Sequence, residues 1–109
     1  MAEKPRPFGG ADTMHYLYIL KSQTDEKIYV GVTESIEARV DAHNKGKVAS
    51  TKDRRPLTLI YYEAYLDKRD AVKRENKLKH HGSAIGHLKR RLKHSLTIGL
   101  PPKERGQFD

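Results

Sequence analysis

The chain has 109 residues, and its 22 Lys and Arg residues outnumber its 14 Asp and Glu residues, which gives a formal net charge of +8. This length provides one small domain, and the positive balance favours a polyanionic partner such as nucleic acid. A charge that only keeps the protein in solution is the alternative interpretation.

The sequence contains no cysteine, which excludes disulfides, a thiol nucleophile and a cysteine-based zinc site, and which fits a reducing compartment. It has no apolar run of membrane-spanning length and no signal-peptide core. We therefore expect a cytoplasmic protein without a membrane partner. Residues 1–13 and 97–109 combine prolines and glycines with charged residues and have no face to bury, so we predict flexible tails around a domain at 14–96.

Two short apolar segments open the predicted domain. The runs His15–Lys21 and Lys27–Thr33 are rich in aromatic and branched residues, and the polar segment between them is typical of a hairpin turn. Alternation along a strand places Tyr18 on one face of the first run and Tyr29 on one face of the second. The sequence therefore predicts two antiparallel strands that each present a tyrosine.

Gly31 interrupts the second predicted strand. A glycine inside a strand lowers stability and marks a bulge or a close backbone approach. Because it shares a face with Tyr29, we favour the close approach of a nucleic-acid substrate at Gly31. A glycine that is required only for packing is the alternative.

A helix is predicted from about Ile36 to Lys45. Ser35 can cap its start, and Gly46 follows its end. Arg39 and His43 are four residues apart, so they share a helical face that borders the apolar stripe. Both side chains are therefore expected at the edge of the core.

The segment Gly46–Pro56 is predicted to be a loop. Its Ser50 and Thr51 hydroxyls and its cationic side chains suit contacts with phosphate, although an ordinary solvated loop has the same composition. The candidate nucleic-acid-binding residues of this loop are Lys47, Lys52, Arg54 and Arg55.

The second half of the chain predicts one strand and two helices. Leu57–Leu66 is apolar on both faces, which is typical of a central strand that is covered on both sides. Asp67 can cap a helix at Lys68–His80, and Ser83 can cap a last helix that ends near His94. The order β-β-α-β-α-α predicts an α+β fold, a small and mainly antiparallel three-stranded sheet flanked by helices.

Glu75 lies on the inward stripe of the helix predicted at Lys68–His80. A carboxylate on a buried face is costly unless it is paired or bound to a cation. It is therefore either the partner of a core-edge arginine such as Arg39 or a metal ligand. The same helix supplies further candidate nucleic-acid-binding residues, which are Lys73, Arg74 and Lys77.

The four histidines near the C-terminal end do not indicate a zinc site, since no cysteine or close acidic ligand accompanies them. We expect them to extend a surface that faces nucleic acid. These residues are His80, His81, His87 and His94.

The remaining polar residues suit the hydrolysis of a phosphodiester. A tyrosine or histidine can take a proton from water, and a planar guanidinium can stabilise charge on the phosphoryl oxygens. A carboxylate can hold a hydrated magnesium ion, which needs few protein ligands. The candidate catalytic residues are Tyr18, Tyr29, Arg39, His43 and Glu75.

The order and spacing of these residues resemble the GIY-YIG nuclease family, in particular its small stand-alone bacterial members, from about His15 to His94. Tyr16 stands where the first motif of the family has glycine. The matching residues, in chain order, are Tyr16-Leu17-Tyr18, Tyr29-Val30-Gly31, Arg39, His43 and Glu75.

The resemblance implies a divalent-metal-dependent endonuclease that hydrolyses DNA in one step at a single Mg2+ or Mn2+ ion. In this family pattern Tyr18 is the base or water-positioning group, Tyr29 is the second-motif tyrosine, and Arg39 binds phosphate. His43 occupies a position that is often histidine, and Glu75 binds the metal. We expect repair or recombination intermediates as substrates; the alternative is a non-catalytic DNA- or RNA-binding domain with the same fold.

Overall fold

The computed structural model describes residues 13–98, so the predicted tails lie outside the described part except at 13, 97 and 98. The order β-β-α-β-α-α is confirmed, with a 3-10 turn at Lys52–Arg54 and a short final helix in addition. The elements are β1 (His15–Ser22), β2 (Ile28–Thr33), α1 (Ile36–Asn44), β3 (Leu57–Tyr65), α2 (Lys68–His80), α3 (Gly82–Arg91) and α4 (Ser95–Ile98).

The three strands form an antiparallel sheet in the order β2-β1-β3. The predicted α+β class is therefore confirmed, but the prediction that Leu57–Leu66 forms the central strand is wrong. The central strand is β1, and β3 lies at an edge, where Tyr62 is 54% exposed. The segment is apolar on both faces because helices pack on both sides of the sheet, which is independent of where a strand lies within it.

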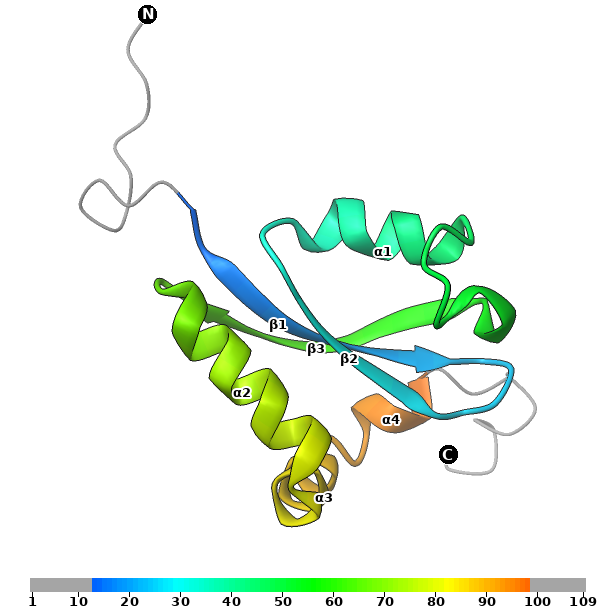
Figure 1. Cartoon of the computed structure of the whole chain (residues 1–109). Coiled ribbons are helices and arrows are strands. Elements are labelled where there is room, and N and C mark those ends of the chain that lie inside the picture. Colours follow the sequence, from blue (N-terminus) through cyan, green and yellow to red (C-terminus); the bar gives the residue numbers. More distant parts are fainter. Residues whose placement is uncertain (1–12, 99–109) are drawn as a thin grey trace, which may run out of the picture.

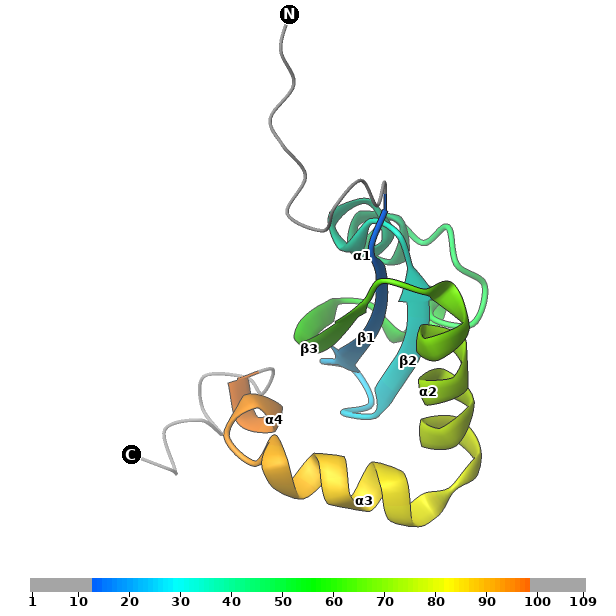
Figure 2. The ribbon, with the colours of Figure 1, turned by 90° about the vertical axis from the view of Figure 1, so that its left-hand side faces the viewer.

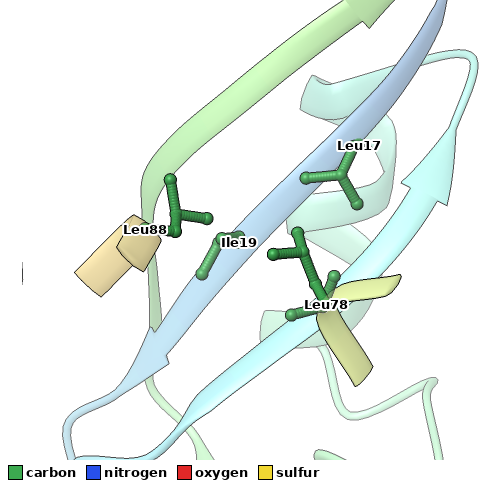
Figure 3. Close-up of a cluster of buried hydrophobic side chains, with 5 residues drawn as sticks. Leu17, Ile19, Leu78 and Leu88 are labelled. Atoms are coloured by element: carbon green, nitrogen blue, oxygen red, sulfur yellow. The ribbon is translucent and has the colours of Figure 1, made fainter. Parts of the chain in front are cut away.

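Helices cover both faces of the sheet. Figure 1 shows α1 on one face and α2, α3 and α4 on the other. The predicted alternation along β1 is confirmed, because Leu17 and Ile19 pack against Leu78 of α2 and Leu88 of α3 (Figure 3). On the opposite face Tyr18 joins a second cluster, which packs against α1 through Val40.

The first two helices begin where their capping residues predict. The Ser35 hydroxyl accepts a hydrogen bond from the Ala38 amide at 3.4 Å, and the Asp67 carboxylate accepts one from the Arg69 amide at 2.8 Å. Gly46, just after α1, has a φ of 76°, the left-handed conformation that ends helices.

The predicted limits of the last helix are wrong. The extended residue His81 both ends α2 and precedes α3, so the helix starts at Gly82 and Ser83 already lies inside it. The helix ends at Arg91, and a turn leads to α4, which includes residues 97 and 98 of the predicted tail. No helix within residues 13–98 combines the length and the apolar composition that a membrane crossing requires.

Glu63 connects β3 to α2. Its carboxylate accepts hydrogen bonds from the Tyr61 and Tyr65 hydroxyls at 2.6 and 2.5 Å, and the Arg74 guanidinium donates to it from Nε and Nη2. Partial burial alone would raise the pKa of Glu63, but the hydrogen bonds from Arg74 and the tyrosines lower it below 4.5. Burial and the Glu63 carboxylate raise the pKa of Tyr65 to about 12.

We expect Glu63→Gln to lower the free energy of unfolding at about pH 7 by about 1–3 kcal/mol, because it removes charge-assisted hydrogen bonds. A carboxylate with a lowered pKa stabilises the fold above its ordinary pKa, and this contribution is lost as pH falls through the lowered value. The difference in the free energy of unfolding between wild type and variant, measured by urea titration, should therefore become smaller from about pH 7 to about pH 3. Glu37→Gln, at an exposed carboxylate of α1, is the control, and a gap that does not depend on pH would contradict this account.

Candidate active site

Tyr18 lies at the centre of the candidate site. It projects from β1, is 1% exposed, and pairs across the sheet with Gly31 of β2. A Cβ atom at Gly31 would lie 2.6 Å from the Tyr18 hydroxyl oxygen, which is closer than such atoms approach in proteins. The Tyr18 phenol fills the space beside Gly31, so the structure favours the packing alternative for this glycine.

His43 connects α1 to this tyrosine. Its side chain is fully buried, and its Nε2 atom lies 2.9 Å from the Tyr18 hydroxyl oxygen. The ring of Tyr29 packs edge-on against the imidazole, with ring centroids 4.8 Å apart. Arg39, one turn earlier on α1, donates from Nε to the Tyr18 hydroxyl oxygen at 3.4 Å. The structure thus brings together these four candidate catalytic residues, from β1, β2 and α1.

Burial sets the protonation of the hydrogen-bonded pair. It raises the pKa of the Tyr18 phenol above 10.0, although the hydrogen bond from Arg39 acts in the opposite direction. Burial also lowers the pKa of the His43 imidazole below 6.5, and the charge of Arg39 lowers it further. At neutral pH the site therefore holds a protonated tyrosine beside a neutral histidine, which can accept a proton.

Glu75 belongs to α2, which lies alongside the edge strand β2 (Figure 2). The Glu75 side chain is 20% exposed, and its carboxylate pairs with Lys79 at 3.1 Å. The Lys79 amino group also lies 5.8 Å from the centroid of the Tyr29 ring, so Glu75 and Tyr29 share one neighbouring cation.

The cation beside Glu75 is therefore Lys79 and not an arginine such as Arg39. Lys79 is not among the residues that the sequence singled out for the site. The spacing of four residues from Glu75 to Lys79 is the signal that could have found it, because such a pair shares one helical face.

The donor groups at this site suit a divalent cation that needs few protein ligands. Among residues 13–98 no three His, Cys, Asp or Glu side chains form a metal-binding group, so Glu75 would be a single carboxylate ligand. Mg2+ suits such a site, because it retains several waters and takes its other ligands from substrate phosphate. A structural zinc ion does not fit, because it requires several nitrogen or sulfur ligands from the protein.

The candidate nucleic-acid-binding side chains divide into engaged and exposed groups. The Arg54 guanidinium donates to the Asp25 carboxylate at 2.8 Å, and Arg74 is engaged by Glu63. Both arginines are partly buried, and both connect parts of the fold. The exposed candidates are Lys47, Lys52, Arg55, Lys73 and Lys77.

Thr51 is buried, contrary to both interpretations of its loop. It is 0% exposed, and its hydroxyl oxygen lies 2.7 Å from Nδ1 of His43. The side chain therefore cannot contact phosphate directly. No periodicity in this polar segment signals its burial, which explains why the sequence did not identify it as part of the site.

The sequence matches the GIY-YIG catalytic domain family over residues 14–93, and the chain belongs to this family. It is 46% identical over 66 residues to a UPF0213 protein of Staphylococcus haemolyticus and 44% identical over 66 residues to one of Staphylococcus aureus. Each alignment covers 60% of this chain and 79% of the relative. The solution structure of a UPF0213 protein from Bacillus halodurans is 28% identical, with a TM-score of 0.43, and the match covers 85% of this chain and 93% of the other.

We expect Gly31→Ala to displace the Tyr18 ring and to lower the free energy of unfolding by about 1–3 kcal/mol through overpacking. Denaturant titration would measure this loss, and NMR shifts of Tyr18 and His43 would report the displaced ring. Gly86→Ala is the control, because the nearest atom to its added Cβ is a flexible arginine end at 3.9 Å. Equal effects of the two substitutions would contradict the packing role of Gly31.

Proposed function

We propose that the chain is a divalent-metal-dependent endonuclease that hydrolyses DNA phosphodiester bonds, including those of repair or recombination intermediates. The observation that carries this proposal is the buried hydrogen bond between Tyr18 and His43, with Arg39 on the same oxygen; Glu75 pairs with Lys79, whose amino group lies near the Tyr29 ring. Membership of the GIY-YIG family supports a nuclease, because the matched catalytic domain, residues 14–93, contains all the candidate catalytic residues.

The buried pair can remove a proton from the attacking water. The Tyr18 oxygen takes a proton from water while its own proton passes to Nε2 of neutral His43. The water oxygen bonds to phosphorus as the bond to the leaving oxygen breaks, and the leaving oxygen takes a proton from solvent. The Arg39 guanidinium would stabilise the charge that builds on the phosphoryl oxygens.

Glu75 would hold the ion, Mg2+ or Mn2+. When bound, such an ion supplies positive charge that neutralises the phosphate. Lys79 now pairs with the same carboxylate, so its amino group would leave Glu75 when that carboxylate binds the ion. Lys79 would then be free to contact the substrate backbone.

The exposed cations would hold the DNA. Lysines that lie in solvent attract the phosphate backbone without reading sequence. RNA is the alternative polyanion for the same surface. The cytoplasmic location expected from the sequence accompanies this proposal, because both nucleic acids occur there in bacteria.

A non-catalytic nucleic-acid-binding domain is the second candidate function. The observation that favours it is the salt bridge between Glu75 and Lys79, because a carboxylate that is already paired with a lysine does not need a metal ion. Salt-sensitive binding is expected from both functions, so affinity does not separate them. Cleavage with Mg2+ or Mn2+ that stops when a chelator is added would separate them.

We expect Glu75→Gln to abolish cleavage while DNA binding remains, because the amide keeps the shape of the side chain but loses its charge. The assay uses duplex, single-stranded, flap and branched DNA with Mg2+ or Mn2+. Asp70→Asn, an exposed acid on the same helix, is the matched control and should cleave at the wild-type rate. Undiminished cleavage by Glu75→Gln would refute the assignment of Glu75, and binding without cleavage by the wild type would favour the second function.

We expect Lys77→Ala to lower the slope of log affinity against log salt by about 1, because one phosphate contact is lost. Arg74→Ala is the contrasting variant: its guanidinium holds Glu63, so it should lower stability and leave the slope unchanged. Fluorescence anisotropy with labelled duplex across a salt series measures both slopes. A larger change in this slope for Arg74→Ala than for Lys77→Ala would contradict the assignment of Lys77 to DNA binding and of Arg74 to the fold.

A further inference from the structure

The hydrogen bond between Thr51 and His43 bears on which ring nitrogen of the histidine carries the proton. An imidazole that is neutral carries one proton, and the partner of one ring nitrogen selects which nitrogen holds it. Nδ1 of His43 lies 2.7 Å from the Thr51 hydroxyl oxygen, and Nε2 lies 2.9 Å from the Tyr18 hydroxyl oxygen. Both partners are hydroxyl groups, so the direction of the two bonds follows from their other contacts.

The surroundings of Thr51 favour a proton on Nδ1. The Thr51 hydroxyl lies 3.5 Å from the carbonyl oxygen of Val48, and a carbonyl can only accept. A hydroxyl that donates its single proton to Val48 is left with lone pairs for the imidazole. In that arrangement it accepts from Nδ1–H of His43.

The surroundings of Tyr18 favour the same tautomer. Arg39 can only donate to the Tyr18 oxygen, and burial keeps the Tyr18 phenol protonated. The phenol proton therefore needs an acceptor, and the Nε2 atom of His43 is at hydrogen-bond distance. Both ends of the imidazole give the same arrangement, with the proton on Nδ1 and the lone pair on Nε2.

We propose that Thr51 is a positioning residue that holds His43 in the Nδ1–H tautomer, with the Nε2 lone pair directed at the Tyr18 hydroxyl. In the proposed reaction, on which the kinetic part of this inference rests, Nε2 receives the phenol proton as Tyr18 takes one from water. His43 then carries both ring protons, and when the reaction is complete Nε2 returns its proton to the Tyr18 oxygen as Tyr18 releases the proton taken from water to solvent.

The loop is held in place so that Thr51 can perform this role. The Ser22 hydroxyl donates to the Arg54 carbonyl at 2.6 Å, and the Leu57 amide donates to the Asn44 side chain at 2.8 Å. These bonds anchor both ends of the segment between α1 and β3. Thr51 is thus fixed by the fold and does not depend on a bound ligand.

The groups that face His43 are two phenols, one hydroxyl and one cation, and none of these described contacts is a carboxylate. The phenols come from β1 and β2, the hydroxyl comes from the loop, and the cation comes from α1. None of them carries a negative charge that would favour a doubly protonated imidazole, so His43 stays neutral until Tyr18 donates to it. The facing groups are Tyr18, Tyr29, Thr51 and Arg39.

The tautomer can be measured directly by ¹⁵N NMR of the His43 ring in the intact protein. We expect the Nδ1–H form in the wild type and in Thr51→Ser, which keeps the hydroxyl. Thr51→Val, which keeps the shape but removes the hydroxyl, should shift the ring toward the Nε2–H form. An Nε2–H tautomer in the wild type, or an unchanged tautomer in a folded Thr51→Val protein, would overturn the proposal.

The kinetic arm uses the DNA substrates described above. Thr51→Val should lower kcat by about 10²-fold, because proton transfer to a general base contributes at least this much, with little change in KM. Thr51→Ser should restore most of the rate, and a Thr51→Val protein with wild-type kcat would overturn the role in catalysis. If the wild type cleaves no DNA, the nuclease proposal fails, while the NMR arm still supports or overturns the role of Thr51.

Discussion

The site depends on the buried hydrogen bond between Tyr18 and His43. Two buried polar side chains need each other as partners, because an unpaired buried donor or acceptor destabilises the fold. The rest of the local structure allows this pair to form. Gly31 leaves room for the phenol, α1 places the imidazole above the sheet, and Thr51 satisfies the far nitrogen. The bond therefore couples β1, α1 and the following loop.

The position of β2 at the edge of the sheet lets a second layer contribute to the same site. The Tyr18 phenol and the Tyr29 ring lie on the face that α1 covers, whereas α2 lies on the opposite face. Because no further strand among residues 13–98 lies beyond β2, Lys79 of α2 can reach the ring of Tyr29 while it pairs with Glu75. A strand added at this edge would separate the carboxylate from the tyrosines. An edge strand is thus a requirement of the site.

Local signals in the sequence were sufficient for the strands, for the caps at Ser35 and Asp67, and for the residues that gather around Tyr18. Periodicity reports which face is covered, but it does not report strand order, so the edge position of β3 could not be predicted. The burial of Thr51 depends on how the loop folds back on His43, which no short-range pattern records. The engagement of Arg74 by Glu63 is likewise a tertiary contact between distant residues. Spacing therefore predicted the motif, whereas the partners of its side chains required the structure.

Some of the candidate DNA-binding cations are paired within the fold and others are exposed, and this difference bears on how DNA would be recognised. Arginine presents a planar fork that suits bidentate contacts, and at Arg74 this fork is used within the protein to hold Glu63. The exposed candidates are mainly lysines, which act as point charges on flexible stems and suit the phosphate backbone. Under the proposed function, the described surface would therefore bind DNA by charge and shape, without base readout. The choice of a cleavage position would then depend on how a strand bends or separates to bring its phosphate to Arg39 and Tyr18.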